Sequence, residues 1–240
     1  NISVHCFDLV SKMSKTPASF KKVSDQIRSD LSDLIRQGQL LPGVPIDEAA
    51  LSKRYGVSKT PIREALLQLE AQGLLKSQSR GGMVLVKMDL RQLLSLFELL
   101  SEIEAIAVRL ASDRITPEEL TALESVHNDS KIFADTEDLT GWQKANEHFH
   151  EIIYHAARNT FLREEALRIR AQTGAYRIHA FGALGRIHSS FVQHGHIVEA
   201  LRQRDSSQAS RVMIKHLLPA NDAQTMTSFI MNIPKDLLTN

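Results

Sequence analysis

Three histidines in the second half of the chain have the spacing to meet at one point: His150, His194 and His216. Asn146 precedes His150 by four positions, so both side chains share one face of a helix. Three imidazoles that leave open positions for water or another ligand suit Zn²⁺, Ni²⁺ or a similar divalent ion. The residues alone leave a second interpretation open, in which each histidine is simply hydrogen-bonded or exposed on an amphipathic helix.

The apolar residues near these histidines indicate which of them face a helical core. Ile197 and Leu201 follow His194 by three and seven positions, which puts His194 in line with the buried stripe of its helix. His216 has apolar neighbours on its own helix: Val212, Met213 and Leu217. The three histidines can therefore converge from three separate helices.

The composition narrows the class of protein that can hold such a site. Hydrophobic residues make up 42% of the 240 residues and charged residues 24%, as in globular rather than disordered chains. Aromatic residues reach only 5%, which favours helices over a turn-rich β-sandwich or barrel. No apolar run approaches the roughly 18 to 20 residues of a membrane span. The single cysteine, Cys6, excludes an intramolecular disulfide and a thiolate-rich zinc site, so we expect a reducing cytoplasm.

Charge is divided between two parts of the chain. Residues 20–88 hold eleven Lys and Arg against seven Asp and Glu, whereas the residues from Asp89 onward hold 16 against 20. Nine of the ten histidines also lie in the acidic second part. A basic first part and an acidic, histidine-rich second part predict different partners for each.

The first part has the element order of a winged helix-turn-helix. Apolar spacing predicts helices over about 22–37, 48–55 and 58–73, followed by two short strands around a glycine turn at 79–82. Gly56 separates the second and third helices, where the turn requires a positive φ that glycine adopts most readily. We expect Asp47 and Ser58 to be the N-cap residues of these two helices.

Polar residues at the start of the third helix are candidates for contact with DNA. They cover the first turn and a half, which a recognition helix points into the major groove: Ser58, Lys59, Thr60 and Arg63. Arg63 can pair bidentately with a guanine edge, Lys59 can reach guanine or phosphate, and the two hydroxyl groups suit phosphate oxygens. Arg80 and Gly81 at the hairpin tip can enter the adjacent minor groove. The alternative is that these charges form only the solvated surface of a small helical module.

The run over 51–75 resembles the DNA-binding signature of the GntR family of bacterial transcription regulators. The motif residues are Gly56-Val57-Ser58, Thr60-Pro61, Arg63-Glu64-Ala65-Leu66 and the stretch 70–74. The resemblance spans about 20–88 and implies DNA contacts by Lys59, Thr60 and Arg63 and by the wing near Arg80 and Gly81. Many relatives carry a basic residue early in the second helix, where this chain has Ala49. Arg54 lies one turn later and is assigned to DNA more loosely.

From Asp89 onward the pattern is helical throughout. Apolar periodicity predicts helices over about 89–113, 140–157, 161–180, 185–203 and 206–217. A further helix is expected from Thr116, where Glu119 completes a capping box. We also expect Asp89 and Asp205 to cap the first and last of these helices. We therefore expect a mainly α protein with an unassigned segment 1–19, a winged helix-turn-helix domain over 20–88 and an all-helical bundle over 89–240.

This second part resembles the FCD domain, the all-helical ligand-binding domain of the FadR-type branch of GntR regulators. The resemblance lies in the stretch 149–162, in His194 with the residues 198–201, and in the stretch 213–217. It implies a metal site made by an acid four residues before the first histidine and by three histidines. Those positions fall on Asn146, His150, His194 and His216. Asn146 departs from the usual Asp, and a neutral amide oxygen is a weaker ligand than a carboxylate.

The same resemblance implies a small effector, often a carboxylate, that completes the coordination of the ion. Many relatives add an Arg on the first long helix near Leu100 or Ser101. This chain lacks that Arg, so we expect an effector other than a simple dicarboxylate. The candidates for effector contact lie on the helix after Phe161: Arg168, Arg170, Gln172, Tyr176 and Arg177.

Together these expectations describe a ligand-responsive repressor. We expect a homodimer that binds palindromic operator DNA and senses a small metabolite in a pocket that contains Zn²⁺ or Ni²⁺. The alternative is a helical metalloenzyme that acts on a small acid through the three histidines. The acids nearest to the ligands in sequence are Glu147, Glu151 and Glu199. Helical spacing directs each of these side chains about 60° or more away from the direction of the histidine on the same helix, so no general base is evident.

Overall fold

The computed structural model describes residues 22–79, 81–181, 186–218 and 223–239. Arg80, a predicted DNA-contact residue, lies outside these described residues. The chain divides between Val86 and Lys87 into two compact units, close to the boundary expected at Met88. Within the described ranges, every helix is too short or too polar to cross a membrane.

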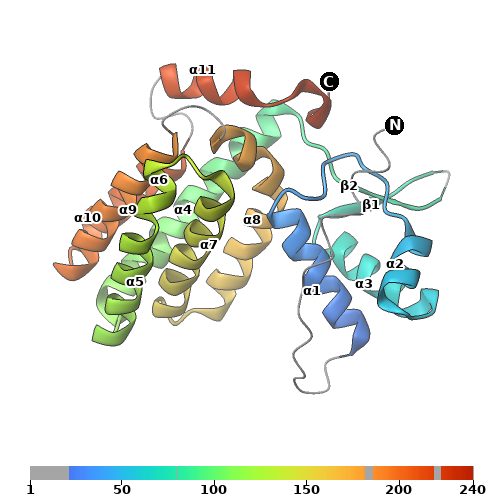
Figure 1. Cartoon of the computed structure of the whole chain (residues 1–240), viewed down its shortest axis with the longest axis horizontal. Helices are drawn as coiled ribbons and strands as arrows, with labels where there is room; N and C mark the ends of the chain where they lie inside the picture. The colour runs from blue at the N-terminus through green and yellow to red at the C-terminus, as the bar shows by residue number, and fades with distance from the viewer. Residues whose placement is uncertain (1–21, 80, 182–185, 219–222, 240) are drawn as a thin grey trace. The chain divides into compact units, whose positions relative to one another are not determined.

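The described part of the N-terminal unit contains three helices and one hairpin (Figure 1): α1 (Val23–Arg36), α2 (Glu48–Tyr55), α3 (Lys59–Ala71), β1 (Leu75–Ser77) and β2 (Met83–Leu85). The two strands pair antiparallel, with Leu75 opposite Leu85. The helices α1 and α3 bury the largest apolar side chains of this unit: Ile27, Leu31, Ile62, Leu66 and Leu69. The predicted winged helix-turn-helix is confirmed.

A tight turn joins α2 to α3. Gly56 ends α2 in the left-handed region, with a φ of 65°. The Asp47 side chain caps α2 by accepting hydrogen bonds from two backbone amides, as predicted. Ser58 occupies the expected N-cap position of α3, but its side chain makes no capping hydrogen bond. The prediction that Ser58 is the N-cap residue of α3 is therefore confirmed, without a side-chain hydrogen bond.

The C-terminal unit is built from helices. They are α4 (Leu90–Arg114), α5 (Pro117–Asp129), α6 (Lys131–Asp135), α7 (Leu139–Ala156), α8 (Thr160–Phe181), α9 (Arg186–Arg202), α10 (Ser206–Leu217), α11 (Ala223–Asn232) and the 3-10 turn Lys235–Leu237. Six of these helices follow the predicted positions. The short helix α6 and the late helix α11 are not predicted by the sequence pattern.

Side-chain caps set where several of these helices begin. Asp89 accepts a hydrogen bond from the amide of Gln92, whose side chain accepts one from the amide of Asp89. Thr116 and Glu119 form the same reciprocal capping box at the start of α5. Asp205 caps α10. These three caps are as predicted, and each satisfies backbone amides that a helix start leaves without a partner.

The main core of the C-terminal unit is shared by α4, α5, α7, α9 and α10 (Figure 1). Its fully buried members come from all five helices and include Val108, Leu123, Phe149, Ile197 and Met213. The one tryptophan of the chain, Trp142, lies on α7, fully buried against Ala134 and Ile187. Because α7, α9 and α10 all contribute to one core, inward-facing polar residues on them are brought together.

Gly56 supports one prediction about the N-terminal unit. A Cβ at this position would meet no atom within 4 Å, so only the positive φ opposes a larger residue. Gly56→Ala should therefore destabilise the turn by about 1 kcal/mol, since an L side chain is strained in the left-handed region. Gly56→Asn is the matched control, because Asn tolerates this conformation better. Amide hydrogen exchange of α2 and α3 in the full chain measures the effect, and equal protection in the parent and the Ala variant would contradict it.

Candidate functional site

The structure brings together His150 on α7, His194 on α9 and His216 on α10. The Nε2 atom of His216 lies 3.3 Å from Nε2 of His194 and 3.3 Å from Nε2 of His150. One ring nitrogen from each residue lies within 4.8 Å of the others. All three side chains are buried. Three imidazole nitrogens therefore converge on one small volume inside the helical unit.

The outer nitrogens of two rings have partners that fix where their protons lie. His150 Nδ1 lies 2.6 Å from Glu104 Oε2, an ion-pair contact that is not aligned as a hydrogen bond. A carboxylate this close repels a lone pair on Nδ1 and so favours the tautomer with the proton there. His216 Nδ1 lies 3.0 Å from the side-chain oxygen of Gln193, which is likewise an acceptor. The Nε2 atoms of His150 and His216 are then both lone-pair donors, although they face each other at 3.3 Å. A cation between them removes that repulsion.

Asn146 adds a fourth acceptor on the same side of α7. It is 6% exposed, and its Oδ1 atom is buried without a hydrogen-bond partner among the described residues. Buried carbonyl oxygens in folded proteins are almost always paired, so an orphaned one indicates a missing partner. An orphaned oxygen one turn before His150, together with three convergent imidazole nitrogens, fits a divalent cation.

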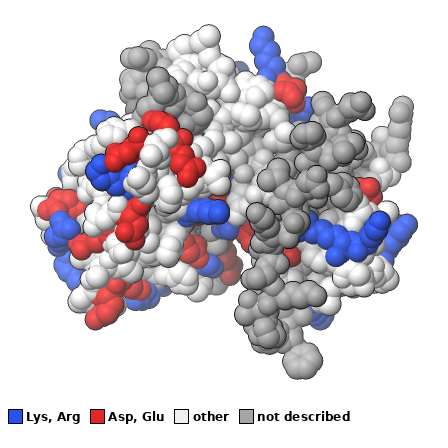
Figure 2. All heavy atoms as spheres, viewed as in Figure 1, with Lys and Arg blue, Asp and Glu red and all other residues white. Residues whose placement is uncertain are grey.

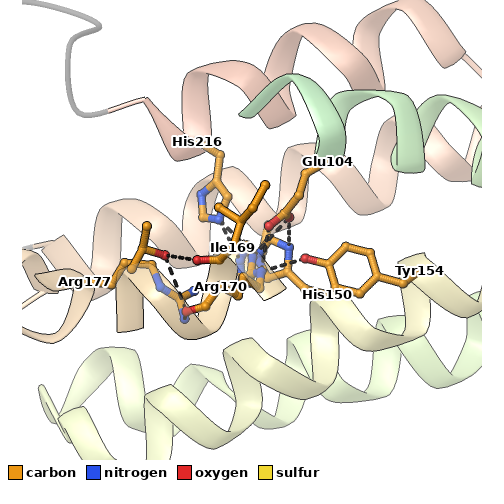
Figure 3. A network of polar contacts seen from close by, with 9 residues as sticks. Glu104, His150, Tyr154, Ile169, Arg170, Arg177 and His216 are labelled. Carbon is orange, nitrogen blue, oxygen red and sulfur yellow. Dashed lines mark hydrogen bonds and ion pairs between the residues drawn. The ribbon is translucent and has the colours of Figure 1, made fainter. Parts of the chain in front are cut away.

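Glu104 on α4 is a functional residue that the sequence interpretation missed. It is fully buried and contacts His150 on one side and Arg170 on α8 on the other (Figure 3). Glu104 Oε1 lies 2.6 Å from Arg170 Nε, and Glu104 Oε2 lies 3.1 Å from Arg170 Nη2. The Tyr154 hydroxyl is also 2.6 Å from Arg170 Nε. A signal for Glu104 existed, because it falls on the apolar stripe of α4 between Leu100 and Val108.

The electrostatics of this network leave Glu104 ionised and the histidines neutral. Burial alone would raise the pKa of Glu104, but the charge of Arg170, together with the contact to His150, outweighs burial and holds it well below its usual range. Burial, followed by the charge of Arg170, lowers the pKa of His150 to about 4. Burial and then the neighbouring imidazoles lower the pKa of His194 and His216 well below the usual value. Neutral imidazoles are the form that binds metal ions.

Of the residues predicted to contact an effector, Arg170 and Arg177 lie in this network. Arg177 donates from Nη2 to the backbone oxygen of Arg170 at 3.4 Å. Its Nε atom and the Nη1 atom of Arg170 are both buried, and neither has a hydrogen-bond partner within the described part of the chain. Burial, together with the charge of Arg170, lowers the pKa of Arg177 to about 10. Two guanidinium groups thus hold unused donors inside the helical unit.

The other three effector candidates are placed differently. Arg168 pairs with Glu165 on its own helix. Tyr176 is fully buried in a separate apolar cluster, where its hydroxyl donates to the backbone oxygen of Leu237 and accepts from the amide of Met88. Gln172 lies half-buried on α8. The polar groups of Arg168 and Tyr176 thus have partners outside the histidine cluster, and their contact with an effector stays a prediction.

The start of α3 forms the second candidate site. Ser58, Lys59 and Thr60 are exposed there, and the Arg63 side chain is 64% exposed. Arg63 Nε lies 3.0 Å from Glu48 Oε2 on α2. Lys and Arg side chains gather over α2 and α3 (Figure 2), which is the distribution expected of a DNA-binding face.

Two further DNA candidates lie beside this face and at the hairpin. The Arg54 guanidinium is 5.4 Å from the centre of the Tyr55 ring on α2, a cation–π arrangement. Gly81 is exposed at the hairpin tip with a φ of 89°, a conformation that glycine adopts without strain. The tip can therefore approach another surface closely.

Comparison with known proteins shows the family. Residues 23–85 match the bacterial regulatory proteins of the gntR family, and residues 95–218, half of the chain, match the FCD domain. The uncharacterized HTH-type transcriptional regulator YdhC of Bacillus subtilis is 29% identical over 80% of this chain and 86% of its own length. The HTH-type transcriptional repressor RspR of Escherichia coli is 26% identical over 81% of this chain and 86% of its own length.

Solved structures agree with this assignment at the level of the fold. Escherichia coli McbR/YncC superposes with a TM-score of 0.78 at 22% identity, over 88% of this chain and 98% of that one. The matching families and relatives are transcriptional regulators and not enzymes, so the metalloenzyme alternative is not favoured. The chain belongs to the GntR family and is a DNA-binding transcriptional regulator with an FCD domain.

Proposed function

We propose that this regulator is a homodimeric repressor that binds a palindromic operator through α3 and responds to a small anionic metabolite through a metal ion in its helical domain. The observation that carries the DNA part is the exposed, cationic start of α3. The repressor role is supported by the relative RspR, which bears that description. The supports for the metal and the metabolite lie in the buried network around His150.

The proposed DNA contacts follow from the chemistry of the α3 start. Arg63 can donate two parallel hydrogen bonds to a guanine edge, and Lys59 and Thr60 can reach guanine or phosphate. We propose lesser roles for Ser58, Arg54, Gly81 and Arg80. One recognition helix reads only a few base pairs, too few to distinguish an operator from competing genomic sites. Two copies on a palindrome supply the missing specificity, which supports a homodimer.

The proposed metal site consists of His150, His194 and His216, with Asn146 as a weak fourth ligand. Zn²⁺ or Ni²⁺ suits imidazole nitrogens, and either ion would supply a Lewis-acid centre to which a small anion can bind. The support is that one ring nitrogen of each histidine lies within 4.8 Å of the others, and that the orphaned oxygen of Asn146 lies one turn before His150 on α7. Glu104 is no candidate for a general base, because it faces the outer nitrogen of His150 and pairs with Arg170.

The proposed effector is anionic because a bound divalent ion would leave the site with an excess of positive charge. Arg170 is balanced by Glu104, and Glu147 is a second acid that acts on Arg177. The ion would add two positive charges to these pairs, and the buried Nε of Arg177 has no hydrogen-bond partner among the described residues. A carboxylate-bearing metabolite that touches both the ion and Arg177 would neutralise this excess. Such a ligand would shift operator affinity only through its preference for one arrangement of the dimer.

The base-reading role of Arg63 gives the first test of this function. Arg63→Ala should weaken binding to an operator selected from random duplexes by about 1–3 kcal/mol and relax the preference at one base pair. Arg63→Lys is the matched control, since it keeps the charge but loses the planar fork, so it should lose base preference while the salt dependence stays unchanged. Mobility shift at fixed salt measures both. An Ala variant that binds every sequence like the parent would exclude base reading by Arg63.

The metal site gives a second test. His194→Ala should lower the affinity for Zn²⁺ and Ni²⁺ by at least about 100-fold, because it removes one of three strong ligands. Asn146→Asp should raise that affinity, because a carboxylate replaces a neutral amide oxygen. His196→Ala, which changes an exposed residue two positions along α9, is the control and should leave the affinity unchanged. Competition with a chromophoric chelator measures all four proteins. Equal affinities in the parent and the His194 variant would contradict the proposed site.

The effector proposal is tested with carboxylates of increasing charge. Acetate, succinate and citrate should bind the zinc-loaded protein in that order of rising affinity. Arg177→Gln should weaken the binding of citrate about tenfold or more, as expected when a hydrogen bond between charged groups is lost. Arg168→Gln is the control, because Arg168 pairs with Glu165. Titration calorimetry measures the affinities. If both variants bind citrate like the parent, Arg177 is not an anion contact.

A further inference from the structure

We infer that Glu104 is a positioning residue for the proposed metal site. It holds His150 with the proton on Nδ1, and it supplies from behind His150 the negative charge that Asn146 does not bring to the ion directly. This inference rests on the proposed function, because it assumes that a divalent ion binds at the three histidines. It adds a residue from α4 to a site whose other members lie on α7, α9 and α10.

The first step of the inference is the geometry at His150. Glu104 Oε2 lies 2.6 Å from His150 Nδ1, and both side chains are almost completely buried. The contact is not aligned as a hydrogen bond, but a carboxylate at this distance repels a lone pair on Nδ1, so it favours the tautomer with the proton on Nδ1. The lone pair of Nε2 then faces His216 and is available to an ion. Without Glu104, the neutral ring of His150 can place its proton on either nitrogen. The form with the proton on Nε2 has no lone pair on that atom and cannot bind the ion through it.

The second step concerns charge. Three neutral imidazoles and one amide oxygen bring no negative charge to a divalent ion. Glu104 touches one of the proposed ligands through the far side of its ring, an arrangement that raises the basicity of the bound imidazole. The carboxylate is shared with Arg170, so its effect on the ion is partial.

The third step separates this role from a purely structural one. If Glu104 served only to neutralise Arg170, two contacts to that guanidinium would be enough. Its Oε2 atom instead lies closer to His150 Nδ1, at 2.6 Å, than to Arg170 Nη2, at 3.1 Å. Arg170 also has the Tyr154 hydroxyl as a second partner. The carboxylate therefore lies where it serves both the histidine and the arginine (Figure 3).

The test compares Glu104→Gln with the parent in the full-length protein and uses Zn²⁺ as the probe. The variant should bind Zn²⁺ about 10- to 100-fold more weakly, the usual effect of losing an outer-shell partner of a metal-binding histidine. In the metal-free protein, long-range ¹H–¹⁵N correlations should show the proton of His150 on Nδ1 in the parent and shared between Nδ1 and Nε2 in the variant. This second readout does not depend on bound metal.

Two further variants separate charge from structure. Adding Asn146→Asp to Glu104→Gln should restore most of the Zn²⁺ affinity, because a negative charge then reaches the ion directly. Tyr154→Phe removes a contact to Arg170 but leaves Glu104 beside His150, so its Zn²⁺ affinity should stay within about threefold of the parent. Glu104→Gln leaves the Arg170 charge unpaired, and this variant can fail to fold. In that event the double variant Glu104→Gln with Arg170→Gln removes both charges, and the same Zn²⁺ affinity and proton position are measured on it.

The outcomes distinguish this inference from the proposed function. A parent protein that binds no Zn²⁺, Ni²⁺ or Co²⁺ would overturn the metal site, and the role of Glu104 with it. The inference about Glu104 would be overturned, and the metal site kept, by a different result. In that case the parent binds Zn²⁺, and the Glu104→Gln variant binds it equally well and keeps the His150 proton on Nδ1. Weaker binding with a changed His150 proton position supports it.

Discussion

A fully buried carboxylate, Glu104, imposes the main constraint on the helical domain. Moving an ionised carboxylate out of water costs several kcal/mol, and only close partners offset that cost. Glu104 finds them in Arg170 on α8 and His150 on α7, so three helices must keep their relative positions for the charge to remain paired. Breaking such a buried pair from one side typically costs about 3–5 kcal/mol. The placement of the histidines therefore follows from an ion pair as well as from apolar packing.

Much of the fold can be predicted because short-range chemistry determines it. Asp47, Asp89, Thr116 and Asp205 each cap a helix as their sequence positions predict, and Gly56 has the positive φ that its turn requires. The helix α6 is only five residues long, so it contains too few apolar repeats to show a period. Ser58 shows that a predicted N-cap residue does not always use its side chain. It occupies the N-cap position of α3, but its hydroxyl group makes no capping hydrogen bond.

The candidate site was predictable where its residues fall on apolar stripes. His150, His194 and His216 each lie on the buried face of a helix, and faces that share a core must meet. Glu104 lies on such a stripe as well, but it lies on a different helix from all three histidines and far from them along the chain. Its pairing with Arg170 joins residues 66 positions apart, which no local pattern can indicate. The partners of the Tyr176 hydroxyl, Leu237 and Met88, come from distant segments, so its sequence position does not indicate them either.

The ion pairs of Arg170 and Arg63 differ in burial, and this difference suits the roles that we propose for the two arginines. Arg170 and Glu104 are both buried, so breaking their ion pair would leave an unpaired charge that water cannot solvate. Arg63 pairs with Glu48 while its side chain remains 64% exposed, and such pairs contribute only about 0.2–1 kcal/mol. A bidentate contact with a guanine contributes about 1–3 kcal/mol of discrimination, which exceeds the cost of releasing Glu48. The surface arginine can therefore exchange a protein partner for a base, whereas the buried arginine keeps a fixed partner and maintains the geometry of the histidines.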